Sequence, residues 1–414
     1  MLPNLTTQRT SVAIHVVIGF LAVAVAGSRA PGQEHDQAGA VADPSGVAGV
    51  VETVDAGAGA GGALQARAAA TLPADPMGGD VPLRLWAQRR DIHFGTAINH
   101  RAVVTDERYR WLAGREFSML TPENAMKMGP LRPSREQFSW DQADAIVRFA
   151  ERHAQQVHGH ALVWHEQNPR WLTEGDWTRE TLLEVMREHI TEVVGRYRGR
   201  VQVWDVVNEA VDEDGSLRDT LWLRVIGPDY IEHAFRWAHE ADPAAVLLYN
   251  DYNAEDLGTK SDGVHELLAD LVGRGVPVHG VGLQMHLTAG MTPTADDFRG
   301  NLRRLADLGL ELHVTEADVR MRLPATADRL RQQAEDYRRM LEIALEQPAF
   351  RSWTIWGFTD LYSWVPRRFE GHGAALPWDE DYQPKPARAA LVEALRGSAV
   401  EPDSEGDSGR ARRP

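Results

Sequence analysis

Eight short apolar segments alternate with helical patterns along this chain of 414 residues, and this alternation predicts an α/β fold, the (β/α)8 TIM barrel. A second observation bounds the barrel. Among 13 Trp, 10 Phe and 8 Tyr, only Phe20 precedes Trp86, and none follows Tyr382. Since large aromatic side chains build cores, we expect a single folded domain over residues 77–396.

The expected strands are apolar runs of the kind that a parallel barrel buries on both faces. In chain order they are Phe94–Ile98, Phe117–Glu123, Val157–Trp164, Val201–Glu209, Ala245–Tyr252, Gly280–His286, Glu311–Ala317 and Ser352–Phe358. Between them, apolar side chains recur at helical spacing, for example from Leu182 to Val193 and from Ala334 to Leu345. The alternative is a doubly wound open sheet. No glycine-rich phosphate loop follows the first strand, which favours the barrel.

The N-terminus has the pattern of a targeting segment. Arg9 precedes the apolar run Ser11–Gly27, and Ala24–Ala26 supplies the small residues that a signal peptidase reads. The run is shorter than the ~20 residues of a typical membrane-spanning helix. We therefore predict a signal peptide at 1–30 and secretion to an extracellular or periplasmic location, with an uncleaved N-terminal anchor as the alternative.

Two flanking segments have too little apolar surface to offset the entropy cost of ordering the chain. Residues 31–76 contain 13 Ala, 8 Gly and no aromatic residue, so we expect a disordered, Ala/Gly-rich linker. Residues 397–414 have a similar polar, small-residue composition, and we expect a disordered tail there.

Charge and cysteine content exclude several classes of function. With 44 basic and 60 acidic residues the formal net charge is -16, which disfavours nucleic acid and stable membrane partners. The chain has no Cys, which excludes disulfides, thiol catalysis and Cys-ligated zinc. We expect a monomer without a cofactor that is stabilised by packing.

Polar side chains gather where each expected strand ends, which is where barrels of this class place their active sites. Along the chain they are Asn99 and His100; Glu123, Asn124 and Lys127; His160 and Trp164; Asn208 and Glu209; Asn250, Asp251 and Tyr252; Gln284 and His286; Glu316 and Asp318; and Trp356. Taken singly, His160 or Trp356 is better explained as a core residue. Because burying so many polar groups unpaired would cost several kcal/mol, their coincidence on one rim favours a site.

Two carboxylates on this rim predict cleavage of a glycosidic bond. That reaction needs one acid to protonate the leaving oxygen and one carboxylate to attack the anomeric carbon. Glu209 and Glu316 are the candidates, and Asn208 is placed to hydrogen-bond a sugar hydroxyl beside the anomeric centre. The alternative for Glu209 is an ion pair with a barrel Arg or Lys. Asp251 and Asp318 are candidates for supporting positions.

The motifs on this rim resemble those of the endo-β-1,4-xylanases of glycoside hydrolase family 10, in the family's order from Leu83 to Arg396. The matching segments are Phe94–Ala97, Glu123–Lys127, Gly159–His165, Trp204–Glu209, Tyr249–Asn253, Gln284–His286, Val314–Asp318, Trp356–Asp360, Trp364 and Tyr382–Ala387. Two positions depart from the family pattern: Met128 replaces the usual Trp, and Ala317 replaces the usual Leu. Neither is a bond-breaking group, but both affect the packing behind such groups.

The resemblance implies retaining, endo-acting hydrolysis of β-1,4-xylosidic bonds in xylan or xylo-oligosaccharides, with no cofactor and no metal. It makes Glu209 the acid/base and Glu316 the nucleophile, hydrogen-bonded by His286, with Asn208 beside them. The substrate-binding residues that it implies are Glu123, Asn124, Lys127, His160, Trp164, Gln167, Tyr252, Gln284, Trp356 and Trp364.

Three alternatives remain at this point. A metal-dependent barrel hydrolase would use histidines, namely His158, His160, His165, His286 and His313, but the first strand lacks the HisXHis pair of such enzymes. A non-catalytic carbohydrate-binding protein would typically have lost one of the two Glu residues. A related β-1,4-glucanase acting on cellulose would lack the GluAsnXMetLys motif at Glu123–Lys127 and the GlnXHis motif at Gln284–His286.

Overall fold

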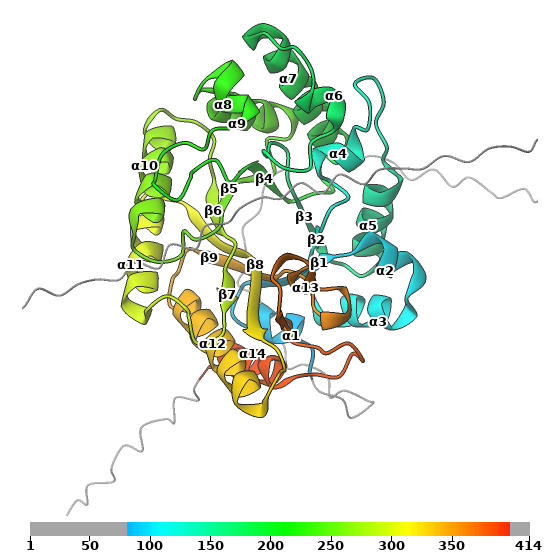
Figure 1. The fold of residues 1–414 in the computed structure, drawn as a ribbon, viewed down its shortest axis with the longest axis vertical. Helices are drawn as coiled ribbons and strands as arrows, with labels where there is room; N and C mark the ends of the chain where they lie inside the picture. The colour runs from blue at the N-terminus through cyan, green and yellow to red at the C-terminus, as the bar shows by residue number, and fades with distance from the viewer. Residues whose placement is uncertain (1–80, 398–414) are drawn as a thin grey trace, which may run out of the picture. The chain divides into compact units, whose positions relative to one another are not determined.

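A ring of eight parallel strands surrounded by helices forms the centre of the protein in the computed structural model, which describes residues 81–397 (Figure 1). The strands of the ring are β1 (His93–Ile98), β2 (Met119–Pro122), β3 (Gln156–Gly159), β4 (Val203–Asn208), β5 (Val246–Asp251), β6 (Gly280–Leu283), β8 (Glu311–Arg322) and β9 (Phe350–Ile355). Because β9 pairs in parallel with both β8 and β1, the sheet closes and leaves no open edge. The predicted (β/α)8 barrel is confirmed.

The helices lie before, between and after the strands, with the longer ones around the outside of the ring (Figure 1). They are α1 (Leu83–Gln88), α2 (His100–Thr105), α3 (Glu107–Glu116), α4 (Met128–Leu131), α5 (Asp141–Arg152), α6 (Arg170–Thr173), α7 (Arg179–Arg196), α8 (Leu221–Ile226), α9 (Tyr230–Ala241), α10 (Thr259–Gly273), α11 (Ala295–Ala306), α12 (Ala327–Leu345), α13 (Val365–Arg368) and α14 (Pro386–Arg396), with a 3-10 turn at Asp360–Tyr362. Several start at a threonine cap. The side chains of Thr178 and Thr326, for instance, accept the first free amides of α7 and α12.

Side chains from both faces of the strands fill the core, as burial of every residue of β4 illustrates. Gly159 pairs with Trp204 across β3 and β4, and a Cβ at Gly159 would lie 2.2 Å from the Trp204 ring. A glycine is therefore required for the two strands to lie this close. The chain leaves β3 directly beneath the barrel mouth, where His160 follows.

The third strand is shorter than predicted, because it ends at Gly159 rather than at Trp164. The amides of Leu162 and Val163 still donate to the carbonyls of Asp205 and Val206, each at 3.0 Å, so this segment follows β4 without being a regular strand. The apolar run continues past Gly159, so the sequence did not predict where the regular strand ends.

Two short strands that the sequence did not predict extend the sheet above the mouth: β7 (His286–Thr288) and β10 (His372–Gly373), both paired with β8. The predictions for residues 1–30, 31–76 and 398–414 lie outside the described residues. A membrane-crossing helix is not found anywhere in residues 81–397.

Candidate active site

The two carboxyl groups predicted to do the chemistry lie at the ends of β4 and within β8, and side-chain amides connect them. Asn250 Nδ2 donates to Glu316 Oε1 at 2.8 Å and to Asn208 Oδ1 at 2.9 Å. Gln284 Nε2 donates to Glu209 Oε1 at 2.9 Å. The structure therefore brings Glu209, Glu316, Asn208 and Gln284 together in one hydrogen-bonded network.

Glu316 is 4 % exposed and faces a histidine that a second carboxylate orients. His286 Nε2 lies 3.3 Å from Glu316 Oε2, and His286 Nδ1 lies 3.0 Å from Asp318 Oδ2. Asp318 Oδ2 also accepts a hydrogen bond from Trp364 Nε1 at 2.7 Å. A protonated His286 therefore donates to both carboxylates at once.

This arrangement keeps a negative charge on Glu316. Burial lowers the pKa of His286, but the charge of Asp318 and the hydrogen bond to it outweigh burial and raise the pKa to about 10. Burial alone would raise the pKa of Glu316, yet the charge of His160 and the hydrogen bond and charge of His286 hold it below its ordinary value. At neutral pH Glu316 is thus ionised, as a nucleophile must be.

Glu209 has different partners. Trp164 Nε1 donates to Glu209 Oε2 at 2.8 Å, and Asn208 Nδ2 donates to Oε1 at 3.2 Å. His165 Nδ1 lies 4.0 Å from Oε2. Glu209 also faces more solvent than Glu316, since it follows the last residue of β4 and lies at the mouth.

Lys127 and three neighbours form one wall of the site. The ammonium of Lys127 donates to Asn124 Oδ1 at 3.0 Å and lies 4.9 Å from the Trp164 ring centroid and 6.0 Å from that of Trp356. Burial lowers the pKa of Lys127. A cation flanked by two indoles suits a sugar ring, whose hydroxyls need donors and whose C–H face packs on aromatic surface.

His160 is fixed from below by Asp205. Its Nδ1 lies 2.8 Å from Asp205 Oδ2, while His158 Nε2 lies 2.8 Å from Asp205 Oδ1. The His160 ring packs edge-on against Trp356 at 5.1 Å, and Nδ1 is 3.9 Å from Glu316 Oε1. His160 is thus held beside Glu316, and Asp205 is a supporting residue that the sequence reasoning missed.

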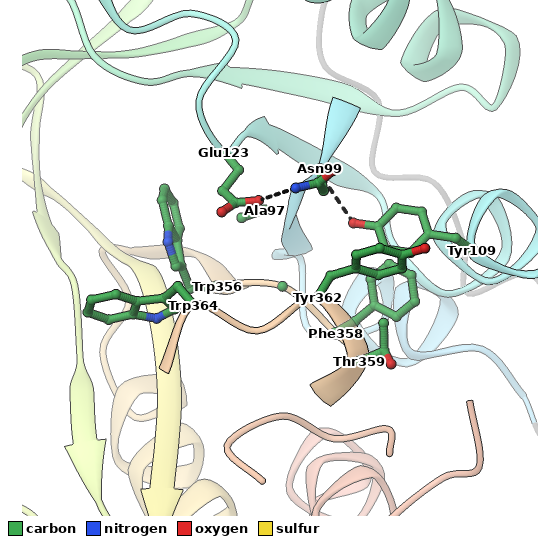
Figure 2. A pocket seen from close by; sticks show the side chains of 10 residues that line it. Ala97, Asn99, Tyr109, Glu123, Trp356, Phe358, Thr359, Tyr362 and Trp364 are labelled. Carbon is green, nitrogen blue, oxygen red and sulfur yellow. Dashed lines mark hydrogen bonds between the residues drawn. The ribbon is translucent and has the colours of Figure 1, made fainter. Parts of the chain in front are cut away.

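Glu123 lies in a small cavity together with the two indoles of Trp356 and Trp364 (Figure 2). Asn99 Nδ2 donates to Glu123 Oε2 at 3.1 Å, and the backbone amide of Asn99 donates to the Tyr109 hydroxyl at 3.0 Å. Glu123 is thereby oriented toward the indoles from the opposite side of the cavity (Figure 2).

Tyr252 lies on another side of the mouth, after β5. Its hydroxyl accepts from Arg218 Nη2 at 2.9 Å, and the Lys260 ammonium lies 3.4 Å from its ring centroid. Lys260 also contributes to a cleft of about 640 Å³ that reaches His286. The cleft thus begins beside His286, which faces Glu316.

Gln167 is a predicted substrate-binding residue whose side chain is not part of the hydrogen-bonded network described above. It is exposed in the segment after β3, where its backbone carbonyl accepts from the amide of Gly129 at 3.0 Å. Among residues 81–397 its side chain makes no hydrogen bond to Glu209 or Glu316. Its role in substrate binding stays a prediction.

The metal alternative has limited support in the described part of the chain. The five histidines named for it do not form one cluster, and the single group with suitable spacing is His160, Asp205 and Glu316, whose ligand atoms lie within 4.8 Å of one another. In that group the Asp205 oxygens already accept from two histidines. The contacts favour a hydrogen-bonded support for the nucleophile.

Two further residues escaped the sequence reasoning as members of the site. Asn250 was visible at the end of the fifth strand but not assigned a part, although it bridges the two halves of the network; Thr315 Oγ1 fixes it by donating to its Oδ1 at 2.6 Å. Arg218 does not directly follow a strand, so the search for polar residues at strand ends did not find it.

The two departures from the family pattern are buried. Met128 begins α4 in the core, and the carbonyl of Ala317 accepts from the Trp356 amide at 3.0 Å. Both residues therefore lie behind the site without touching the carboxyl groups of Glu209 or Glu316 through any hydrogen bond in residues 81–397.

A (β/α)8 barrel whose mouth holds an ionised carboxylate, a second carboxyl group and aromatic walls defines the class of glycosidases that work with two carboxyl groups. Comparison with known proteins gives the family. Residues 83–394 match the model of Glycosyl hydrolase family 10, and the chain belongs to this family. The resemblance seen in the motifs is confirmed.

Individual relatives agree with this assignment. The chain is 46% identical over 320 residues to "Endo-1,4-beta-xylanase B" of Thermotoga neapolitana, covering 76% of this chain and 92% of that protein. It is 42% identical over 287 residues to "Endo-1,4-beta-xylanase A" of Fusarium oxysporum, covering 68% and 88%. Among solved structures, xylanase 10B from Thermotoga petrophila in complex with xylobiose superposes with a TM-score of 0.75 at 46% identity, covering 77% of this chain and 98% of that one.

Proposed function

We propose that this protein is an endo-acting, retaining β-1,4-xylanase that hydrolyses xylan and xylo-oligosaccharides. The observation that carries the proposal is the pairing of a buried Glu316, kept ionised by His286, with Glu209 through a network of amides. The xylanase names of the relatives and the xylobiose in one structural neighbour support the choice of substrate.

The geometry supports a double displacement in two steps. In the first, Glu316 attacks the anomeric carbon, the bond to the leaving oxygen breaks, and Glu209 gives that oxygen its proton. In the second, Glu209 takes a proton from water, the water oxygen bonds to the anomeric carbon, and Glu316 is released. Retained β configuration follows from two successive inversions.

The residues around the carboxyl groups would hold the sugars in place. Lys127 and His160 lie beside Trp356 and offer hydrogen bonds at the point of cleavage, while Glu123 and Asn124 are placed for the next sugar toward the non-reducing end. Tyr252 and the cleft beside it would receive the leaving-group side of the chain.

The test is product analysis on purified xylan and on cellulose. We expect xylobiose and longer oligomers from the middle of xylan chains and little release from cellulose. Cello-oligosaccharides as the main products would favour the glucanase alternative. Loss of activity after dialysis against a chelator, restored by a divalent metal, would favour the metal-dependent alternative.

We also propose that the protein is exported, on the strength of the apolar run Ser11–Gly27 and the small residues Ala24–Ala26. N-terminal sequencing of the protein recovered outside the cytoplasm should begin after residue 26. Recovery only in the membrane fraction with Met1 intact would instead identify an anchor.

A further inference from the structure

The backbone that carries Glu209 has an uncommon conformation. Glu209 has a φ of 58°, in the left-handed region that residues other than glycine rarely adopt. Such a conformation persists only where surrounding contacts fix it, and it is frequent at functional sites. The amide of Glu209 donates to the Asn250 carbonyl at 2.8 Å, which fixes one end of the residue.

Arg218 fixes the other end. Its Nε donates to the Glu209 carbonyl at 2.9 Å, and its Nη2 donates to the Val211 carbonyl at 3.0 Å. Its own backbone amide donates to the Ala210 carbonyl at 2.8 Å. One arginine therefore binds the three successive carbonyls that begin at Glu209.

The amides of the same segment are fixed from the barrel side. The Tyr249 hydroxyl accepts from the amides of Ala210 and Val211, each at 3.1 Å, and donates to Asp251. Every backbone N–H and C=O from Glu209 to Val211 thus has a partner, and Arg218 supplies the donors to all three carbonyls.

Arg218 also reaches the leaving-group side of the site. Its Nη2 donates to the Tyr252 hydroxyl at 2.9 Å, and its side chain is only 14 % exposed. The planar guanidinium offers several donors in a fixed fork, which a lysine ammonium cannot reproduce. One side chain therefore joins the backbone of Glu209 to Tyr252.

We propose that Arg218 is a positioning residue for proton transfer: it holds Glu209 so that its carboxyl group meets the leaving oxygen, and it aligns Tyr252 with it. The inference rests on the proposed glycosidase function. Because Arg218 acts through Glu209, its loss should slow bond cleavage only where the leaving group needs a proton.

The experiment compares two substrates in Arg218→Lys and Arg218→Met. Cleavage of a 2,4-dinitrophenyl β-xylobioside needs no proton on the leaving oxygen, whereas cleavage of xylohexaose does. We expect kcat/KM for xylohexaose to fall about 10- to 100-fold, while kcat/KM for the dinitrophenyl substrate stays within about 3-fold. Arg224→Met is the matched control, because Arg224 is exposed on α8 and its side chain binds Asp219 alone among residues 81–397; both activities should persist.

Equal losses on both substrates would overturn the inference, since they would indicate a general structural defect, and so would unchanged activity on xylohexaose. If Arg218→Met does not fold, as judged by its thermal melt, the Arg218→Lys variant decides between these outcomes. A wild-type protein that cleaves neither substrate would instead overturn the proposed function.

Discussion

Glu209 and Glu316 are the same residue type, but their side chains have different neighbours. Glu316 is buried against His286, which Asp318 keeps charged, and the pKa of Glu316 is lowered as a result. Glu209 instead receives hydrogen bonds from neutral amide and indole groups. A carboxylate held beside a cation is suited to attack an anomeric carbon.

Replacing each carboxyl group separately should expose this division. Glu316→Ala should abolish turnover of every substrate, because no nucleophile remains. Glu209→Ala should abolish turnover of xylan but still form the intermediate from a dinitrophenyl xylobioside, and azide should accelerate its breakdown. Steady-state kinetics with and without azide provide the measurement. Near-native hydrolysis of the activated substrate by Glu316→Ala would show that the assignment is wrong.

Trp364 is placed to distinguish xylose from glucose. Its indole borders the cavity of Glu123 and donates to Asp318, so it forms a rigid wall on this side of the site (Figure 2). An extra hydroxymethyl group should clash with this wall, at a cost of ~1 to 3 kcal/mol, or ~10- to 200-fold in kcat/KM.

Accordingly, Trp364→Ala should shift the ratio of kcat/KM for aryl xylobioside over aryl cellobioside toward the cellobioside. Trp364→Phe is the control, because it loses the hydrogen bond to Asp318 but keeps much of the wall. If the ratio is unchanged in Trp364→Ala within error, the discrimination lies elsewhere.

At the residue scale, the sequence could predict the chemical groups but not their connections. The positions of Glu209 and Glu316 at the barrel mouth were predictable because both lie at or near the ends of apolar runs, while their catalytic roles stay predictions. Two hydrogen bonds depend instead on which side chains meet across neighbouring strands: the one from Asn250 to Asn208 and the one between His160 and Asp205. Spacing along the chain does not contain that information.

The loop after β9, which carries Trp364, is joined to the start of α14 by a buried ion pair. Lys385 Nζ lies 2.8 Å from Asp360 Oδ2 and donates to the Ala374 carbonyl at 2.7 Å. Asp360 Oδ1 accepts from the amide of Leu376 at 2.9 Å. Removing one partner of a buried pair leaves an uncompensated polar group.

Lys385→Met should therefore lower the free energy of unfolding by roughly 3 kcal/mol, measured by urea denaturation. The control is Arg170→Met, which breaks an exposed pair with Glu174 and should change the value by at most ~0.5 kcal/mol. Equal effects of the two substitutions would contradict the structural importance of the buried pair.

At the element scale, apolar runs predicted the existence of all eight barrel strands, while their ends were less predictable. The chain leaves β3 at Gly159, yet its next residues remain apolar because they pack beside β4. An apolar sequence indicates that residues are buried, and the residues after Gly159 stay buried although regular strand pairing has ended. The short strands β7 and β10 have too few residues for a periodic pattern.

For the whole molecule, pH should act on stability through buried carboxyl groups outside the reacting pair. Glu255 follows β5, is 4 % exposed and accepts from the Met285 amide at 2.8 Å. Burial raises its pKa to about 7, above the ordinary 4.5. Because the folded state binds this proton more tightly, the stabilising contribution is full below pH 4.5 and is lost as pH rises through 7.

Glu255→Gln retains an acceptor for the Met285 amide and removes the titration. The difference in unfolding free energy between variant and wild type should therefore shift in favour of the variant by up to about 3 kcal/mol from pH 4.5 to pH 8. Urea denaturation at the two pH values measures it. A difference that does not change with pH would refute this source of pH dependence.

Aromatic residues from Trp86 to Tyr382 predicted one core, and the helices and strands of the described residues lie between Leu83 and Arg396. The predicted bounds of the domain, 77–396, stay a prediction. Closure of the barrel was inferred from the count of strands. The pairing of β9 with both β1 and β8, which proves closure, is a long-range contact without a local pattern.

The central claim is that Glu316 forms a covalent bond to the sugar during turnover, and trapping that bond tests it most directly. The wild-type protein is incubated with 2,4-dinitrophenyl 2-deoxy-2-fluoro-β-xylobioside, and its intact mass and peptides are then measured. We predict a mass increase of one fluoroxylobiosyl group, located on Glu316. Absence of a mass increase despite turnover of xylan, or a label on Glu209 or Asp318, would contradict the account.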